Sequence, residues 1–401
     1  MKEIFLRRKK KAQFDQLHNR LQTNSIKWDT LEKDYQVRDL SAFWVADMDF
    51  QVAPAIQQAL SEYVATGIYG YHLLPDSLYE AIISWQKRRH GYDIQKEAIL
   101  VSSGVVPSLV MCIESLTRPG DAILIHDPVY PPFAEVVENN HRQLIRSSLM
   151  KHEGKFQMDL HEMETLIIDH QIKLFILCNP QNPGGRVWSN EELKQLGLLC
   201  QKHHVLVISD EIHQDLILAP NHFTSFQTVD ESFAEFSVIL TSATKTFNLA
   251  GVKLAMIFAK NRELREKTKS LQQVTRQDEV NTFGIIATQA AYDYAEDWLE
   301  ELLVYLKMNV EETCAFFSES LPKVTVMQPE GTYLIWLDFS AYGLTDEELH
   351  HQLIYEAGVV LNKGATFGSN GKQHVRMNVA CSNRLLKKGL IQIKEAFLRL
   401  A

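Results

Sequence analysis

The stretch "SVILTSATKTFNLAGVKLAMIFA" (237–259) joins two apolar runs through a polar segment that carries a lysine, Lys245. The two apolar runs have the length and the residue types of buried strands. A lysine that follows a strand is ordinarily a solvated surface charge. Lys245 instead lies among small hydroxyl residues, Ser242 included, and a second cation, Lys253, follows eight positions later. The apolar runs therefore indicate strands, and the polar residues around Lys245 raise the question of whether it has a functional role.

Similar apolar runs precede this stretch and alternate with helical patterns. The runs that resemble strands are AILVS (98–102), AILIH (122–126), KLFILCN (173–179) and VLVISD (205–210). The helical patterns between them include VPSLVMCIESL (106–116) and NEELKQLGLLCQKH (190–203). Nearly continuous apolar strands with helical crossovers are typical of a mainly parallel sheet that helices cover on both faces. The sequence therefore predicts an α/β fold.

The C-terminal part of the chain has a different pattern. It predicts, in order, a long helix over about 284–320, strands at 324–327 and 332–339, a helix at 345–357, a strand at 373–380 and a closing helix. Residues before about 50 lack the strand–helix rhythm, and we expect them to pack against this second unit. We predict a large domain over 50–285 and a smaller α+β domain made of 1–49 and 286–401.

Composition excludes several classes of protein. The chain has 401 residues, 45% of them hydrophobic, and a net charge of −9, which disfavours nucleic acid as the main partner. Its five cysteines lack C-x-x-C spacing, so we expect no disulfide frame, no metal site and a reducing cytoplasm. No apolar stretch approaches the roughly 20 residues of a membrane span. The basic run "RRKKK" (7–11) could contact an acidic partner, although a solvated chain end is the simpler interpretation.

The residues that follow the predicted strands are the first place to look for a site. In open α/β sheets, ligands bind beyond the carboxyl ends of the strands. Polar and glycine-rich segments collect there: SSGVVP (102–107), DPVYPPF (127–133), NPQNPGG (179–185), DEIH (210–213) and SATK (242–245).

Lys245 and its neighbours suggest a cofactor. A desolvated lysine amine can form a Schiff base with an aldehyde, and small hydroxyl neighbours leave room for a bulky ring. Ser242 and Lys253 could bind a phosphate. An aldehyde together with a phosphate indicates pyridoxal 5'-phosphate (PLP). An ordinary surface lysine remains the alternative on spacing alone.

Two further strand ends would suit the same cofactor. Asp210 could pair with the pyridine nitrogen and keep the ring protonated, but a helix cap would explain a single aspartate equally well. Backbone N–H groups at Gly104 and Val105 would point outward at a helix N-terminus and could bind an anion. A tight turn is the alternative explanation for the glycine.

Three more residues complete the pattern. Asn182 could donate to the phenolic oxygen of the cofactor, or belong to a simple loop of turn residues. Tyr130 could stack on the ring, or be an ordinary half-buried tyrosine. Arg376 lies among apolar residues and needs an anion, either the carboxylate of an amino-acid substrate or an internal Asp or Glu.

The order of these residues resembles the fold-type I PLP enzymes of the class I/II aminotransferase superfamily, over nearly the whole chain from about residue 13. Within it, the chain is most similar to the aminotransferase-like cystathionine β-lyases, which are carbon–sulfur lyases. The motifs that carry the resemblance are NSIKWD (24–29), FWVADMDF (43–50), YGYHLLPDSLYEAIISWQKRRHGYDI (69–94), CNPQNPGGRVW (178–188), SDEIHQDL (209–216), TKTFNLAG (244–251) and PEGTYLIWLDF (329–339).

The resemblance implies a role for each residue. Catalysis would depend on Lys245, which forms the Schiff base, with Asp210 at the ring nitrogen and Tyr130 stacked on the ring. The other implied cofactor contacts are Asn182, His213, Gly104, Val105, Ser242 and Lys253, with Tyr71 supplied by the neighbouring subunit of a homodimer. The implied contacts of the amino-acid substrate are Arg376, Asn182 and the backbone at Ala46.

Some positions depart from the superfamily pattern. Where typical aminotransferases have a tyrosine three residues after the acid, this chain has His213, as in the lyase branch. Ser103 replaces a common proline, Thr244 a common serine, and ACSNR (380–384) lacks the usual proline. The resemblance therefore implies a β-lyase that converts cystathionine to homocysteine, pyruvate and ammonia. An aminotransferase on the same site is the alternative, and a PLP-binding regulator would need a DNA-binding module that the sequence does not suggest.

Overall fold

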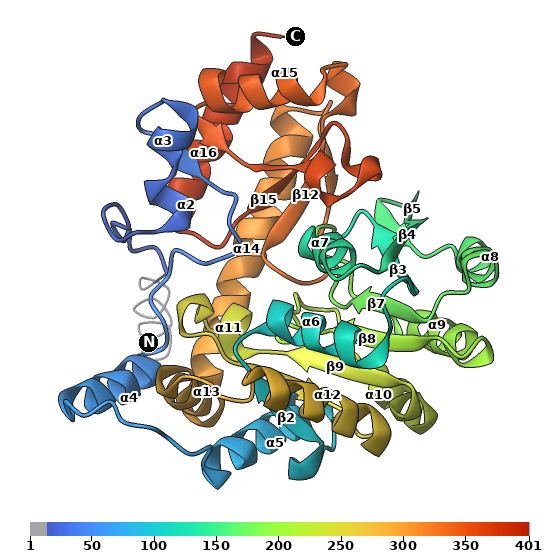
Figure 1. Cartoon of the computed structure of the whole chain (residues 1–401). Helices are drawn as coiled ribbons and strands as arrows, with labels where there is room; N and C mark the ends of the chain where they lie inside the picture. The colour runs from blue at the N-terminus through green and yellow to red at the C-terminus, as the bar shows by residue number, and fades with distance from the viewer. Residues whose placement is uncertain (1–13, 401) are drawn as a thin grey trace.

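A computed structural model describes residues 14–400 of the chain. Its main sheet has seven strands in the order β2-β10-β9-β8-β7-β3-β4 (Figure 1). Their bounds are β2 Ile99–Ser102, β10 Ala255–Phe258, β9 Ser237–Thr241, β8 Leu206–Asp210, β7 Leu174–Cys178, β3 Ala122–Asp127 and β4 Gln143–Ser148. Together with the small antiparallel sheet described below, this sheet confirms the predicted α/β fold. Strand β4 was not predicted from the sequence, because it lacks an apolar run and only Ser147 in it is fully buried.

Strand directions bring the polar strand ends to one edge of the sheet. All neighbouring strands are parallel except β10, which runs antiparallel to both β2 and β9. The carboxyl ends of β2 and β9 therefore lie at the same edge, and the chain enters β10 from that edge. As a result Gly104, Lys245 and Lys253 all lie at the edge where Asp210 ends β8.

Helices cover both faces of this sheet, which explains the nearly continuous apolar strands. In β3, for example, Ile123 and Ile125 pack into one core and Leu124 into the other, and all three are fully buried. One face is covered by α6 (Val105–Leu116), α7 (Pro132–Asn139) and α12 (Arg262–Thr275). The helices on the other face include α5 (Asp76–His90), α8 (Leu160–His170), α9 (Asn190–Lys202) and α13 (Thr282–Tyr294), and α4 (Pro54–Ala65) packs on α13.

The C-terminal part forms a four-stranded antiparallel sheet in the order β11-β12-β15-β14. Its strands are β11 Thr325–Met327, β12 Leu334–Asp338, β15 His374–Asn378 and β14 Asn362–Lys363. The α-helices of this part are α14 (Glu296–Ser320), α15 (Asp346–His351) and α16 (Asn383–Leu398). In Figure 1, α14 leads from α13 to this small sheet.

The single long helix expected over 284–320 is wrong, because the chain leaves the helical conformation at Ala295, where φ is −111° and ψ is 14°. No glycine or proline marks the break in the sequence. Tertiary packing accounts for it instead. Helix α13 packs on α4 and α5, whereas α14 packs on α16 and β11. The two helices thus belong to different layers.

The described part of the N-terminal segment packs on the C-terminal unit. Strand β1 (Ser41–Ala42) pairs in parallel with β13 (Val359–Val360). The apolar cluster under this pair consists of Leu31, Leu40, Ala42, Ile354 and Val360. The exact domain limits, 50–285 against 1–49 with 286–401, stay a prediction.

Other features raised by the sequence can be placed briefly. The basic run at 7–11 lies outside the described residues. Between residues 14 and 400, no helix is long and apolar enough to cross a bilayer, and no group of three or more His, Cys, Asp or Glu side chains could hold a metal ion. All five cysteines are free thiols, and all but Cys314 are buried.

Candidate active site

Lys245 lies in the short helix α11 (Ala243–Thr246), which follows β9 directly. Its side chain is partly buried, and its Nζ donates a hydrogen bond of 2.6 Å to the carbonyl oxygen of Ala46. The hydroxyl of Tyr333 donates to the same oxygen at 3.0 Å. Lys245 is therefore not the solvated surface lysine of the simpler interpretation, since a backbone carbonyl 199 positions away in the chain holds its amine.

The surroundings of Lys245 favour its neutral amine. Burial lowers the pKa of Lys245 to about 8, and the positive charge of Arg376 adds to this effect. Asp47 and Asp210 oppose it, because their carboxylates favour the ammonium form. A lysine with a lowered pKa is a nucleophile and a base at a pH close to neutral.

Asp210 ends β8 and is 4% exposed. Burial raises the pKa of its carboxyl group to about 7, against smaller opposing effects from the Ile212 N–H and from Lys245. One carboxylate oxygen accepts that N–H at 3.1 Å, but residues 212–215 form turns and the next helix begins only at Phe226, so the helix-cap alternative is wrong. Three residues on, burial lowers the pKa of His213 to about 3, which keeps the ring neutral. Its Nδ1 is buried and has no hydrogen-bond partner among the described residues.

Replacing Asp210 by asparagine is expected to stabilise the ligand-free protein. An unfolded aspartate releases its proton near pH 4, whereas the folded one keeps it up to about pH 7. The folded state therefore binds more protons between these values, and its stability falls as the pH rises through them. We expect Asp210→Asn to raise the free energy of unfolding by roughly 2–4 kcal/mol at pH 8 and by less toward pH 5. Urea titrations at both pH values measure this difference.

The matched control is Asp93→Asn, which changes an acid whose side chain is 66% exposed. This variant is expected to alter the free energy of unfolding by less than about 0.5 kcal/mol at either pH. An Asp210→Asn effect that is the same at pH 5 and pH 8 would contradict the burial argument.

Arg376 lies on β15 and is 4% exposed. Among the described residues its guanidinium donates to neutral oxygens: Nη1 to Asn182 Oδ1 at 2.9 Å, and Nη2 to Asn362 Oδ1 at 2.6 Å and to the Trp44 carbonyl at 3.2 Å. The internal salt bridge considered from the sequence is therefore wrong, since no Asp or Glu of residues 14–400 pairs with it.

The guanidinium of Arg376 is a buried cation in need of an anion. It lies 4.9 Å from the centre of the Phe367 ring, and its Nε has no hydrogen-bond partner among the described residues. Burial lowers the pKa of Arg376 to about 10, which is a sign of the cost of this charge without a counter-ion. A planar guanidinium in such a setting suits a ligand carboxylate.

Asn182 and Tyr130 lie beside this group. The Asn182 side chain accepts from Arg376 through Oδ1, and its backbone N–H donates to the Cys178 sulfur at 3.4 Å. Tyr130 is half-buried, and burial raises the pKa of its hydroxyl. The positive charge of Arg376 opposes this effect, and the carboxylate of Asp210 adds to it. The structure thus brings Lys245, Asp210, His213, Tyr130, Asn182 and Arg376 into one region.

Other predicted residues lie at the same edge without a bond to Lys245. Gly104 precedes α6 with a φ of +152°, which favours glycine, and Val105 is the first residue of that helix. The hydroxyl of Ser242 bonds to the Leu254 carbonyl and accepts from the Thr244 N–H. Lys253 is exposed. Their proposed part in binding a phosphate stays a prediction.

Tyr71 lies apart from this region. It is fully exposed, in the segment between α4 and α5, and lines a surface hollow together with Tyr69 and Phe283. Within one subunit it therefore does not join the other predicted site residues.

Sequence reasoning missed several residues of the site. Tyr333 donates to the Ala46 carbonyl, and Asn362 accepts from Arg376. Tyr333 belongs to the motif PEGTYLIWLDF (329–339), but its residue type did not indicate that partner. The acids of FWVADMDF (43–50) were available as a signal, because two aspartates, Asp47 and Asp49, interrupt an apolar run. These two aspartates pair with Arg20 and Lys27, and no periodic pattern in the sequence connects the two pairs of residues.

Comparisons with known proteins agree with this geometry. The family model "Aminotransferase class I and II" matches residues 45–393. The chain is 41% identical to the cystathionine β-lyase PatB of Bacillus subtilis over 96% of its own length and 99% of the relative's. It is 42% identical to a PLP-bound putative aminotransferase from Clostridium difficile, with a TM-score of 0.93 over 96% and 99% of the two chains. A PLP-bound C–S lyase from Staphylococcus hominis is 32% identical, with a TM-score of 0.89 over 96% and 97%.

Proposed function

Because the chain belongs to the class I and II aminotransferase family, and within it to the PLP-dependent carbon–sulfur lyases of the cystathionine β-lyase type, we propose that it cleaves cystathionine. The reaction breaks the bond between sulfur and the β-carbon, adds one water, and yields homocysteine, pyruvate and ammonia. Cysteine and cystine are further candidate substrates. This activity would belong to sulfur amino acid metabolism in the cytoplasm, a compartment that suits five free thiols.

The residues of the site fit the cofactor. Lys245 supplies an amine of lowered pKa for an aldehyde. Asp210 supplies a buried carboxyl group without a cation bound to it, and a protonated ring nitrogen would restore its charge. We assign Tyr130 to the ring face and Asn182 and His213 to the ring edge. Gly104, Val105, Ser242 and Lys253 are assigned to the phosphate.

The observation that carries the proposal is that Lys245 and Arg376 contact the same loop, at Ala46 and Trp44. Lys245 Nζ contacts the Ala46 carbonyl, and Arg376, which pairs with no acid of residues 14–400, contacts the Trp44 carbonyl two residues earlier. An α-amino acid has a carboxylate, which Arg376 would bind, and an α-proton, which the neighbouring amine of Lys245 would remove. We assign the substrate carboxylate to Arg376, with Asn182 and the Ala46 backbone beside it.

Within this site each residue has a simple task. When bound, PLP accepts the electron pair released at the α-carbon of the substrate. The neutral amine of Lys245 takes the α-proton as general base, and its pKa of about 8 suits that exchange. Arg376 orients the substrate through its carboxylate, and Asp210 keeps a negative charge beside the ring nitrogen. Departure of the thiolate from the β-carbon then completes the cleavage.

The second candidate function is an aminotransferase, favoured by the likeness to the Clostridium difficile protein. The two reactions differ only after the α-proton is removed. His213 in place of the usual tyrosine favours the lyase. To decide, the purified PLP-loaded protein is incubated with cystathionine, cystine or cysteine and no keto acid. The lyase releases pyruvate and free thiol from cystathionine, whereas the absence of both products would refute it.

We further propose a homodimer in which each subunit supplies Tyr71 to the other's cofactor phosphate. The exposure of Tyr71, with Tyr69 and Leu73 also exposed in the same segment, supports this proposal. We expect a dimer in light scattering. We also expect Tyr71→Phe to weaken PLP binding by about tenfold, the effect of one charge-assisted hydrogen bond. A monomer with full cofactor affinity would refute this proposal.

A further inference from the structure

The loop formed by residues 44–49 carries two backbone carbonyls into the candidate site, and we refer to it as the carbonyl loop. Its Ala46 oxygen accepts from Lys245 at 2.6 Å and its Trp44 oxygen from Arg376 at 3.2 Å. Neither contact depends on the identity of the side chain at those positions. The contacts that hold the loop backbone in place therefore decide whether these carbonyls reach Lys245 and Arg376.

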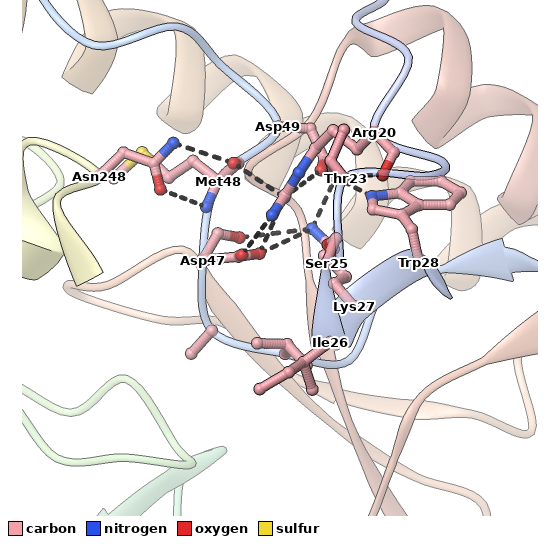
Figure 2. A network of polar contacts seen from close by, with 12 residues as sticks. Arg20, Thr23, Ser25, Ile26, Lys27, Trp28, Asp47, Met48, Asp49 and Asn248 are labelled. Carbon is pink, nitrogen blue, oxygen red and sulfur yellow. Dashed lines mark hydrogen bonds and ion pairs between the residues drawn. The ribbon is translucent and has the colours of Figure 1, made fainter. Parts of the chain in front are cut away.

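On one side, the carbonyl loop is held by ion pairs with the N-terminal segment (Figure 2). Arg20 binds both oxygens of Asp47, at 2.6 and 3.1 Å, and reaches Asp49 at 2.8 Å. Lys27, whose side chain is fully buried, binds the other Asp49 oxygen at 2.8 Å and the Asp47 carbonyl at 3.3 Å. Bidentate arginine–carboxylate pairs fix orientation as well as distance.

On the other side, two asparagines connect the loop to the residues that it serves. Asn248 lies three positions after Lys245 and brackets Met48, accepting from its N–H at 2.9 Å and donating to its carbonyl at 3.0 Å. Asn378 lies two positions after Arg376 and donates to the carbonyls of Val45 and Asp47, at 2.6 and 2.7 Å. The carbonyl loop is thus held in register with both Lys245 and Arg376.

We propose that Asp47 is a positioning residue, which through its ion pairs with Arg20 at 2.6 Å and Lys27 at 3.8 Å holds the Ala46 carbonyl against the amine of Lys245. This role rests on the proposed function only in that the lysine is the reacting amine. An amine that donates one hydrogen to a fixed carbonyl has its lone pair directed elsewhere. A displacement of about 1 Å at such a contact can cost on the order of 10²-fold in rate.

Asp47 also acts on the pKa of Lys245 through its charge. The charged groups that act on Lys245 are Arg376, which disfavours its ammonium form, and Asp47 and Asp210, which favour it, while the neutral His213 and Tyr333 lie nearby. Removing the Asp47 charge lowers the pKa of Lys245. Loss of the Ala46 contact lowers it further, because a carbonyl acceptor stabilises the protonated amine.

The test uses Asp47→Asn with Glu32→Gln as the matched acid-to-amide control. Glu32 lies in the same N-terminal segment, its side chain is 63% exposed, and it pairs with Arg38 away from the carbonyl loop. For the loaded enzyme with cystathionine, we expect Asp47→Asn to lower kcat by about 10- to 100-fold and to change KM by less than about threefold. For the full chain without cofactor, competitive acetylation read by mass spectrometry should give a Lys245 pKa lower by about 0.5–1 unit.

A second variant, Arg20→Lys, keeps the positive charge but loses the planar fork, and a kcat between those of wild type and Asp47→Asn is expected. If Asp47→Asn fails to fold, the kcat of Arg20→Lys tests the positioning role of Asp47 in its place. Wild-type kcat in Arg20→Lys, or an unshifted Lys245 pKa in a folded Asp47→Asn, would overturn the proposal. If no variant cleaves cystathionine but the Lys245 pKa still shifts, the proposed function fails and the positioning role stands.

Discussion

Replacing Lys245 by alanine is expected to abolish both carbon–sulfur cleavage and the yellow absorbance of the lysine-bound cofactor. The variant loses the amine that donates to the Ala46 carbonyl, and with it the base for the α-proton. General-base catalysis alone contributes about 10²- to 10⁴-fold, so we expect kcat to fall by at least about 10³-fold. Stopped assays for thiol and a visible spectrum of the purified protein measure the two effects.

Lys253→Ala is the control for removal of a lysine from the same strand end. Lys253 is exposed and is assigned to the phosphate, so its loss should weaken cofactor affinity yet keep the yellow absorbance at saturating PLP. Borohydride reduction of the wild type should fix the cofactor on Lys245 alone, as peptide mapping would show. A Lys245→Ala protein that stays yellow, or a label on Lys253, would remove Lys245 from its role.

Replacing Arg376 by methionine is expected to lower kcat/KM for cystathionine by about 10²- to 10⁴-fold, since two charge-assisted hydrogen bonds of about 1.5–3 kcal/mol each are lost. Methionine fills much of the same volume without the charge. The guanidinium is buried, and its hydrogen-bond partners among residues 14–400 are neutral oxygens. Steady-state kinetics should place most of the change in KM.

Two comparisons separate carboxylate recognition from general damage to the site. Arg376→Lys keeps the charge but cannot form the bidentate pair, so we expect a kcat/KM between those of wild type and Arg376→Met. A substrate methyl ester lacks the carboxylate, and the wild type should discriminate against it while Arg376→Met should not. Equal losses on acid and ester would contradict the assignment.

Much of the fold follows from local pattern. Strands such as β3 are apolar on both faces because helices cover both sides of the sheet, and a run of that kind is visible in the sequence. The end of α13 at Ala295 is not visible, because it reflects packing against α4 and α5 on one side of the break and α16 on the other. No local residue encodes such a choice.

Some residues of the site could likewise be predicted from the sequence, and others could not. Lys245, Asp210 and Asn182 were predicted because each follows an apolar run, and parallel strands bring such positions together. The Ala46 carbonyl was not predicted as the partner of Lys245, because backbone groups leave no trace in the residue type. The pairing of Arg20 with Asp47 spans 27 positions through a segment without periodic structure, so it becomes visible only in the folded chain.

The stoichiometry of products from cystathionine tests the central claim most directly. The PLP-loaded protein, free of keto acids, is given a hundredfold excess of cystathionine, and thiol, pyruvate and ammonia are counted against enzyme sites. A β-lyase predicts the three products in a 1:1:1 ratio over many turnovers. An aminotransferase would stop after one amino transfer per site and release no thiol, and that result would contradict the account.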